Sequence, residues 1–160
     1  MPEFCMEGRD HMVRAESEFV AGFLEASFFA SMSQFDSENW NDPETQDAIA
    51  EGRSDGELPR DASYCHIDKD DLIKVREYCD RFQKLNRRLL TRAYKRNYDE
   101  MQSGRDFYFT RAGHGVGYWS RDELESRGLG SALTESCGSG EVNPYAEVIG
   151  ETIKVFFYLS

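Results

Sequence analysis

The sequence predicts an α+β fold: an antiparallel sheet of three to four strands packed against two long helices, with short extra helices. Two periodic patterns support this prediction. In two long segments apolar residues recur at steps of three and four, the spacing of a helix with a buried face, whereas nearer the C-terminus they alternate as in strands. The chain of 160 residues, 39% of them hydrophobic, is large enough to bury one core.

Segment 1–13 shows neither pattern, and we predict that it is irregular. Its His11-Met12 dipeptide is what a common cloning junction encodes, so the segment is left out of the functional interpretation. Residues 14–160 are expected to form a single domain that contains an acidic connector at 33–67.

The first strong helical pattern runs from Glu16 to about Met32. Its apolar side chains fall on one broad face, which predicts a helix buried on one side. The phenylalanines on this face could line a binding groove, but packing in the core is the more general use of such a face.

The connector at 33–67 is strongly acidic. Asp42-Pro43 and the later Gly52 predict a short helix within it, because aspartate caps helices, proline fits the first helical position and glycine follows the last. The carboxylates make the connector either a solvated insertion or a surface that occupies a basic groove on a partner, as nucleic acid would. The acidic surface comprises Asp36, Glu38, Asp42, Glu44, Asp47, Glu51, Asp55 and Glu57.

The longest helical pattern extends from Asp68, a suitable N-cap, to about Gln102, with Gly104 as a suitable stop. Unbroken, this helix would be about 50 Å long, which exceeds what most domains accommodate. We therefore expect a kink or break near Asn86 or Asn97.

The second half of this segment is basic, with no acid among residues 84–96. On a continuous helix its cations would lie on one side, opposite the apolar face. Such a stripe can follow a phosphate backbone, form a solvated face, or dock against the acidic connector of the same chain. The basic stripe comprises Arg81, Lys84, Arg88, Arg92 and Lys95.

Alternation after residue 104 predicts a β-hairpin, with strands at Asp106–Arg111 and Val116–Ser120 and a glycine-rich turn between them. A short helix that ends at Gly138 is expected to follow.

Two further strands are predicted at the C-terminus, Tyr145–Ile149 and Thr152–Leu159, joined by a turn at Gly150-Glu151. The last strand is apolar on both faces, which predicts a central or covered position in the sheet.

The glycine-rich turn is the segment best suited to a site. Three glycines in five residues allow successive N–H groups to form an anion-binding nest. Arginines flank the turn and His114 lies at its tip, so it could hold a phosphate or a carboxylate and transfer a proton. No nucleophile is paired with this histidine in the sequence, which favours recognition over catalysis. The candidate binding residues are Arg111, Gly113, His114, Gly115, Gly117, Trp119 and Arg121.

The same segment carries a resemblance. It is similar to a motif of a family of small, uncharacterised accessory proteins encoded by bacteriophages and other mobile elements. The motif is an aspartate, an aromatic residue, two variable positions and Thr-Arg, then a variable position, Gly-His-Gly, another variable position, glycine, an aromatic residue and tryptophan. The resemblance covers about the last third of the chain, with looser similarity near 19–29, and implies an accessory role. The matching residues are Asp106, Thr110, Arg111, Gly113, His114, Gly115, Gly117, Tyr118 and Trp119.

Charge and cysteine content bound the function further. The net charge of −11 divides into −13 over residues 1–72 and +2 over residues 73–160. Acidity in the first part repels polyanions and attracts basic partners, and it also keeps a protein in solution. The four cysteines are too far apart for a zinc knuckle or a redox dithiol, and we interpret them as reduced thiols.

We expect a cytoplasmic protein with no membrane segment, metal or cofactor, because apolar runs are short and the three histidines lie far apart. The leading hypothesis is an accessory protein of the phage type that binds a host protein through the acidic surface and the glycine-rich turn. A nucleic-acid-binding module that uses the basic stripe is the first alternative. A small enzyme centred on Arg111 and His114 is the second.

Overall fold

A computed structural model describes residues 9–160 of the chain. Within this range the fold is α+β, as predicted, but its one sheet is a two-stranded antiparallel hairpin. The elements are α1 (Arg9–Ala15), α2 (Glu18–Ser31), α3 (Pro43–Ala50), α4 (Lys69–Leu85), α5 (Arg87–Tyr94), α6 (Glu100–Arg111), α7 (Leu129–Cys137), β1 (Val142–Ile149) and β2 (Thr152–Leu159). Five short 3₁₀ turns supplement them at Ser37–Asn39, Tyr64–His66, Tyr118–Ser120, Asp122–Leu124 and Ser126–Gly128.

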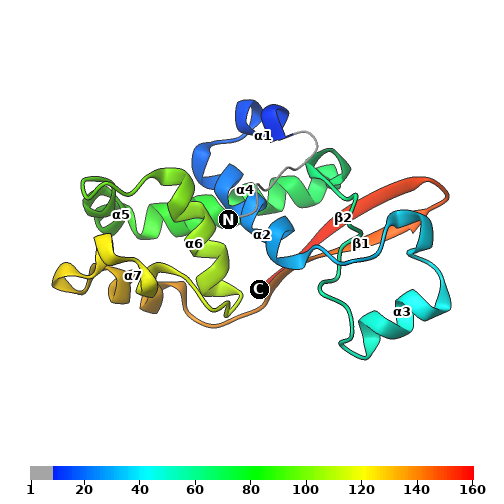
Figure 1. Cartoon of the computed structure of the whole chain (residues 1–160). Helices are drawn as coiled ribbons and strands as arrows, with labels where there is room; N and C mark the ends of the chain where they lie inside the picture. The colour runs from blue at the N-terminus through cyan, green and yellow to red at the C-terminus, as the bar shows by residue number, and fades with distance from the viewer. Residues whose placement is uncertain (1–8) are drawn as a thin grey trace.

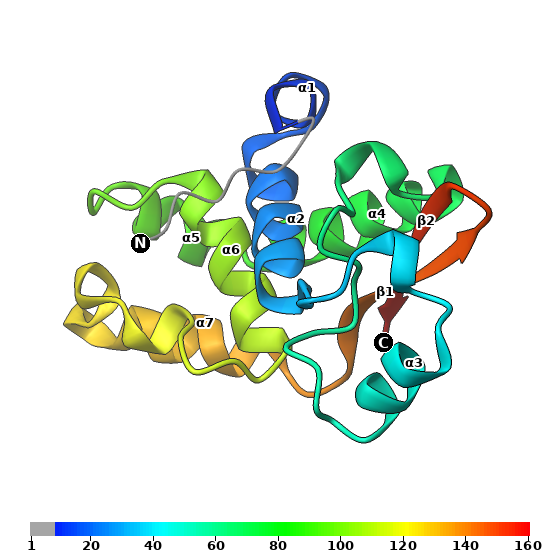
Figure 2. The ribbon, with the colours of Figure 1, turned by 45° about the vertical axis from the view of Figure 1, so that its right-hand side comes forward.

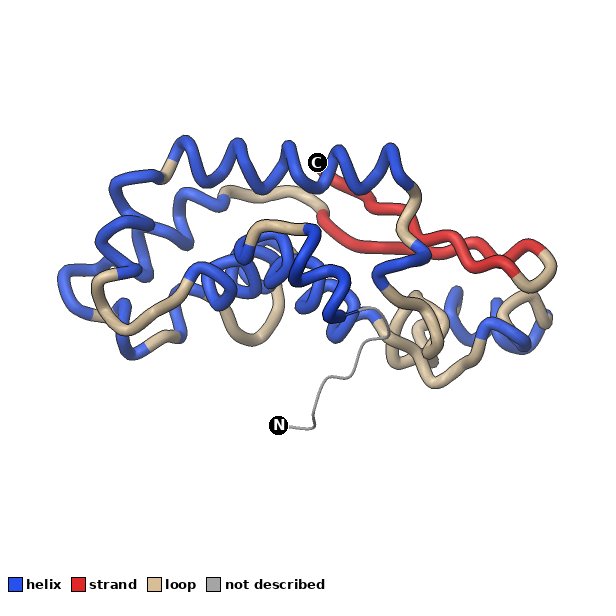
Figure 3. The backbone as a smooth tube through the Cα atoms, turned by 90° about the horizontal axis from the view of Figure 1, so that it is seen from above, coloured by secondary structure: helices blue, strands red, loops and turns tan. Residues whose placement is uncertain are grey.

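The elements are arranged along an elongated body around α2. Helices α5 and α7 lie at one end, and the hairpin and α3 lie at the other (Figure 1). Seen from above, α4 runs along one side of this body and the hairpin extends from beside it (Figure 3).

The N-terminal prediction is wrong for the part that the structure describes. Residues 9–15 form α1, and the side chain of Met12 is completely buried against the core. Burial of this side chain holds the helix against the core. The residues around Met12 are mostly polar or charged, so the sequence pattern does not predict this contact. Residues 1–8 lie outside the described range.

Helix α2 confirms the first predicted helix and is the centre of the core. Ser17 caps it by accepting a hydrogen bond from Val20 N (3.3 Å). All of residues 19–28 are buried, so the helix is covered on every side and not on one side only. Helices α4 and α6 and strand β1 contact it from different directions.

Helices α2 and α6 touch through their backbones (Figure 2). A Cβ atom on Gly104 would lie 1.9 Å from Phe19 O, and one on Gly22 would lie 2.0 Å from Met101 O. Because both positions are glycine, the helices approach until their main chains are in contact. Beside this contact Phe107 stacks on Phe82 with ring centroids 4.1 Å apart.

The predicted strand at Asp106–Arg111 and the predicted stop at Gly104 are both wrong, because α6 runs through them. Residues 106–109 are all buried. A segment that is buried on every side shows no helical stripe, and its aromatic residues then imitate a strand. The predicted strand at Val116–Ser120 is also absent, since this segment contains the 3₁₀ turn Tyr118–Ser120.

The long basic helix breaks where the sequence predicted. Asp68 caps α4 by accepting from Asp71 N (3.1 Å), and α4 ends at Leu85 with Asn86 as its C-cap. The Asn86 side chain donates to Phe82 O (2.9 Å), so it terminates the helix by bonding to its last turn. A second interruption lies at Asn97, which has a φ of 57°.

The C-terminal hairpin confirms the last two predicted strands, with the turn at Gly150 (φ 62°). The prediction that the last strand is central or covered holds only in part. Its inner face packs on the core, and its free edge meets residues 67–71, where Asp68 N donates to Val155 O (2.9 Å). The other face is open, and Tyr158 on it is 55% exposed.

We predict that Gly104→Ala lowers the free energy of unfolding by about 3 kcal/mol, because the new methyl group forces α2 and α6 apart. Gly115→Ala is the matched control. No atom lies within 4 Å of a Cβ there, so we expect a change within about 0.5 kcal/mol. Urea unfolding followed by circular dichroism measures both variants, and equal midpoints would contradict the proposed backbone contact.

Candidate functional site

The glycine-rich segment is the C-terminal cap of α6 and not a hairpin turn. Gly113 takes a left-handed conformation (φ 71°), and His114 N donates to Phe109 O (2.8 Å), which closes the last turn of the helix. Residues 112–116 are exposed to solvent. The segment is therefore accessible, as predicted, although its neighbours differ from those expected.

Asp106, the first residue of the motif, is completely buried. Arg121 Nη2 donates to its Oδ1 (2.7 Å) and Arg121 Nε to its Oδ2 (2.9 Å). Tyr98 Oη adds a bond of 2.6 Å to Oδ2, and Gln102 Nε2 approaches Oδ1 at 3.3 Å. The hydrogen bond to Asp106 raises the pKa of Arg121, and burial followed by the nearby carboxylate raises that of Tyr98. This cluster fixes the chain after the turn to α6, so Arg121 is not available to a ligand.

Thr110, Gly117 and Tyr118 fix the other side of the turn. Tyr118 N donates to Thr110 Oγ1 (3.1 Å), and a Cβ atom on Gly117 would lie 2.3 Å from that oxygen. The Tyr118 ring is completely buried, with its hydroxyl 2.9 Å from Ser103 Oγ. These motif residues therefore have a structural role in the described fold.

The side chain of Arg111 also makes its hydrogen bonds outside the turn. Its Nε donates to Tyr78 Oη (2.6 Å) and its Nη1 to Cys137 O (2.7 Å), and its Nη2 donates to Ser160 O. The guanidinium thus joins α6 to α4, α7 and the end of β2. The structure does not bring Arg111 and His114 together as a pair.

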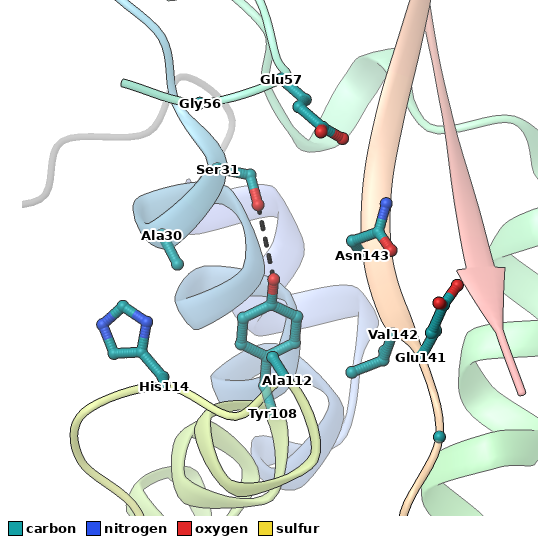
Figure 4. A pocket seen from close by; sticks show the side chains of 11 residues that line it. Ala30, Ser31, Gly56, Glu57, Tyr108, Ala112, His114, Glu141, Val142 and Asn143 are labelled. Carbon is teal, nitrogen blue, oxygen red and sulfur yellow. Dashed lines mark hydrogen bonds between the residues drawn. The ribbon is translucent and has the colours of Figure 1, made fainter. Parts of the chain in front are cut away.

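His114 faces an open cleft of about 500 Å³ (Figure 4). Its ring stacks on Phe109 with centroids 5.0 Å apart, and in the described part of the chain it has no hydrogen-bond partner. Trp119, by contrast, is 53% exposed and does not line this cleft. The lining residues are Ala30, Ser31, Gly56, Glu57, Tyr108, Ala112, His114, Gly140, Glu141, Val142 and Asn143.

The cleft is polar and carries only negative formal charge. The hydroxyls of Ser31 and Tyr108 lie 3.4 Å apart, and burial raises the pKa of Tyr108. Glu57 and Glu141 contribute carboxylates, and no lysine or arginine is among the lining residues. Directly behind this wall lies a cation, because the Arg111 guanidinium packs against the lining residue Gly140.

The connector is fixed to the end of α2, and this places Glu57 at the cleft. Leu58 N donates to Ser31 O, and Ser33 N donates to Leu58 O, both at 2.9 Å. Gly56 allows this approach, because a Cβ atom there would lie 2.1 Å from Ser31 O. The connector is thus part of the fold, and its α3 confirms the predicted short helix.

Most carboxylates of the acidic surface are free of cations. Asp36 pairs with Arg60 (2.9 Å) and Glu51 with Arg53 (2.8 Å), and both arginines belong to the connector. Within residues 9–160 the other six have no ion-pair partner and are exposed: Glu38, Asp42, Glu44, Asp47, Asp55 and Glu57.

The basic stripe is exposed as well, and the connector does not cover it. Lys84 pairs with Asp80 (2.8 Å) on its own helix, while Arg81, Arg88, Arg92 and Lys95 form no ion pair in the described range. The break at Asn86 divides the stripe between α4 and α5. Helices α5 and α3 stand at opposite ends of the molecule, so the two charged surfaces are separate (Figure 1).

The remaining predictions concern the cysteines, metal sites and membrane segments. Cys79 and Cys137 are buried free thiols and Cys65 is an exposed one, while Cys5 lies outside the described residues. Among residues 9–160, no three His, Cys, Asp or Glu side chains are grouped in a way that suits a metal ion. No helix in that range combines the length and the apolar character needed to cross a bilayer.

Comparison with protein families, curated proteins and solved structures gives no match.

Sequence reasoning missed several residues of the cleft: Ser31, Tyr108, Glu141 and Asn143. Ser31 and Tyr108 lie on helices, and Glu141 and Asn143 lie at the start of the final hairpin, so only tertiary packing brings them together. Tyr108 carries the one available signal, since it lies within the motif.

We predict that Asp106→Asn lowers the free energy of unfolding by about 3 kcal/mol, because it leaves Arg121 without its buried counter-charge. Asp122→Asn is the matched control, with an exposed carboxylate close by, and we expect a change within about 0.5 kcal/mol. Chemical denaturation measures both. Similar losses in the two variants would contradict the structural role assigned to Asp106.

Proposed function

We propose that this chain is a non-enzymatic accessory protein of the phage or mobile-element type, which binds a basic host protein through its acidic surface and glycine-rich turn. The observation that carries the proposal is the meeting of these two segments at the cleft. Glu57 of the acidic surface and His114 of the turn line the same cleft, although 57 positions of sequence separate them.

Electrostatics supports a protein partner of opposite charge. Six carboxylates of the acidic surface are exposed and unpaired in the described range, and the chain carries a net charge of −11. Unpaired surface charge contributes little to the stability of the chain that carries it, but it steers the approach of a basic partner.

The surroundings of His114 support binding over catalysis. An acid–base residue needs a partner that orients it and a group on which it acts. The His114 ring stacks on Phe109, and the Arg111 guanidinium is held by Tyr78 and two backbone carbonyls. The enzyme hypothesis therefore lacks the assembled pair on which it depended.

The test is a comparison of variants in a pull-down from bacterial host lysate at low and high salt. We expect the wild type to retain a protein that the variant Asp42→Asn/Glu44→Gln/Asp47→Asn does not retain, and high salt to release it. The control is Asp122→Asn/Glu123→Gln/Glu125→Gln, which removes the same charge from another exposed segment. If no protein is retained at low salt, or if both variants retain it equally, the proposal fails.

A second candidate function is nucleic-acid binding through the basic stripe. It is favoured by one observation: four of the five cations of the stripe are exposed and have no ion pair in the described part of the chain. Tyr94 lies on the same helix α5 and is partly exposed, so a base could stack near these cations.

For this candidate we predict a gel shift with single-stranded DNA that weakens steeply as salt increases. The charge reversals Lys84→Glu, Arg88→Glu and Arg92→Glu, made together, should abolish the shift, because they remove three phosphate contacts. A shift that survives them would exclude the stripe as a nucleic-acid site.

A further inference from the structure

The C-terminal hairpin carries an aromatic patch on the face that points away from the core. Alternation places Tyr145 and Ile149 of β1 on this outer face, with Phe156 and Tyr158 of β2 beside them. Tyr145 is 40%, Tyr158 is 55% and Ile149 is 71% exposed. Tyr145 stacks on Phe156 across the ladder, with ring centroids 5.5 Å apart. The patch is thus ordered and open to solvent, and a surface of this kind marks an interaction site.

Other segments of the same chain approach the two edges of the hairpin and leave this face uncovered. At the β2 edge Asp68 N donates to Val155 O (2.9 Å). At the β1 edge Asn41 Nδ2 donates to Val148 O (2.8 Å). A partner that covers the aromatic patch would therefore pack face to face on the hairpin.

One charge of each sign lies on the outer face at the same level of the ladder. Glu147 and Lys154 are register partners, and both are exposed. Within residues 9–160 Glu147 has no ion-pair partner, and Lys154 meets Asp68 only at 3.8 Å. The face therefore presents a carboxylate on one strand and an ammonium group on the other.

This arrangement is complementary to itself. A two-fold axis parallel to the strands places β1 of one copy over β2 of the other, so that Glu147 of each copy lies over Lys154 of its partner and Tyr145 lies over Phe156. A two-fold axis across the strands at that level would place Glu147 over Glu147 and Lys154 over Lys154. The charges thus favour the first orientation and oppose the second.

We propose that the outer face of the hairpin binds a second copy of this chain, in a two-fold dimer whose axis runs parallel to the strands. The aromatic side chains of the two copies pack against each other between the sheets, and two pairs of Glu147 and Lys154 fix the register. A second copy would also account for a last strand that is apolar on both faces, because it supplies the cover that the chain itself lacks.

The size of the face sets the strength of this dimer. Each strand has eight residues, and a rise of about 3.3 Å per residue gives a length of about 26 Å. Two strands make the face about 10 Å wide, so the interface belongs to the weak, reversible class. Lys74, Glu77 and Arg81 border Tyr158 on the side of α4 and carry both signs, so the pair Glu147 and Lys154 sets the orientation.

Sedimentation equilibrium of the full chain tests the proposal at loading concentrations from about 1 μM to about 500 μM, the range in which a weak interface dissociates. We expect the mass to rise from 18.4 kDa toward twice that value. Tyr145→Ser/Tyr158→Ser should weaken the dimer at least about tenfold. The matched control is Val13→Ser/Leu85→Ser, which removes exposed apolar side chains from α1 and α4 and should leave the dissociation constant within about twofold.

Charge exchange tests the orientation. Glu147→Lys and Lys154→Glu should each be monomeric, because each variant places like charges opposite each other. When the two variants are mixed, a dimer with one copy of each should form, since every lysine then meets a glutamate. Circular dichroism confirms that each variant is folded before it is measured.

Three results would overturn the proposal: a mass of 18.4 kDa for the wild type at every concentration, a dimer that survives Tyr145→Ser/Tyr158→Ser, or a mixture of the folded charge variants that stays monomeric. None of these measurements involves the acidic surface or the glycine-rich turn. The inference therefore goes beyond the proposed function, and either can fail without the other.

Discussion

The backbone contact between α2 and α6 is the constraint on which the rest of the structure depends. Gly22 and Gly104 each leave no room for a Cβ atom, so the helices touch along their main chains. The aromatic side chains beside the contact then fill the core, where Phe23 lies 5.7 Å from Phe107 between ring centroids. The same crossing brings Tyr108 to the Ser31 hydroxyl, so the cleft owes its inner wall to this contact.

A second constraint fixes the part of the chain that comes after α6. A buried carboxylate is costly unless it is fully paired, and Asp106 is paired with Arg121, Tyr98 and Gln102. Together with the Thr110–Tyr118 bond, this holds the returning chain against α6 and leaves residues 112–116 as an exposed loop between two fixed points. The motif therefore encodes a support for the loop, and its glycine–histidine–glycine centre and Trp119 are left exposed for contact with a partner.

The elements that the sequence predicts are those with one buried face and one exposed face. Helix α4 has one apolar face, and the length of the basic segment alone predicts a break near Asn86 or Asn97. The final hairpin alternates and has glycine at its turn. The strand prediction for 106–111 is wrong because residues 106–109 are all buried and the aromatic residues among them favour strands locally. The site was predictable only where its residues are neighbours in sequence. The turn and Glu57 were identified separately, whereas Ser31 and Glu141 enter through tertiary packing, which no local pattern records.

The separation of charge gives the two candidate functions a common physical basis. The acidic connector pairs with Arg53 and Arg60 of its own segment, and the cations of α5 remain exposed at the opposite end. A domain of this length has a radius of gyration of about 15 Å, while the Debye length at physiological salt is about 8 Å. The two surfaces are therefore screened from each other, and a ligand at one end meets little of the field from the other. Binding of a basic protein at the cleft and of a polyanion at α5 would then be independent, so each can be tested in the presence of the other.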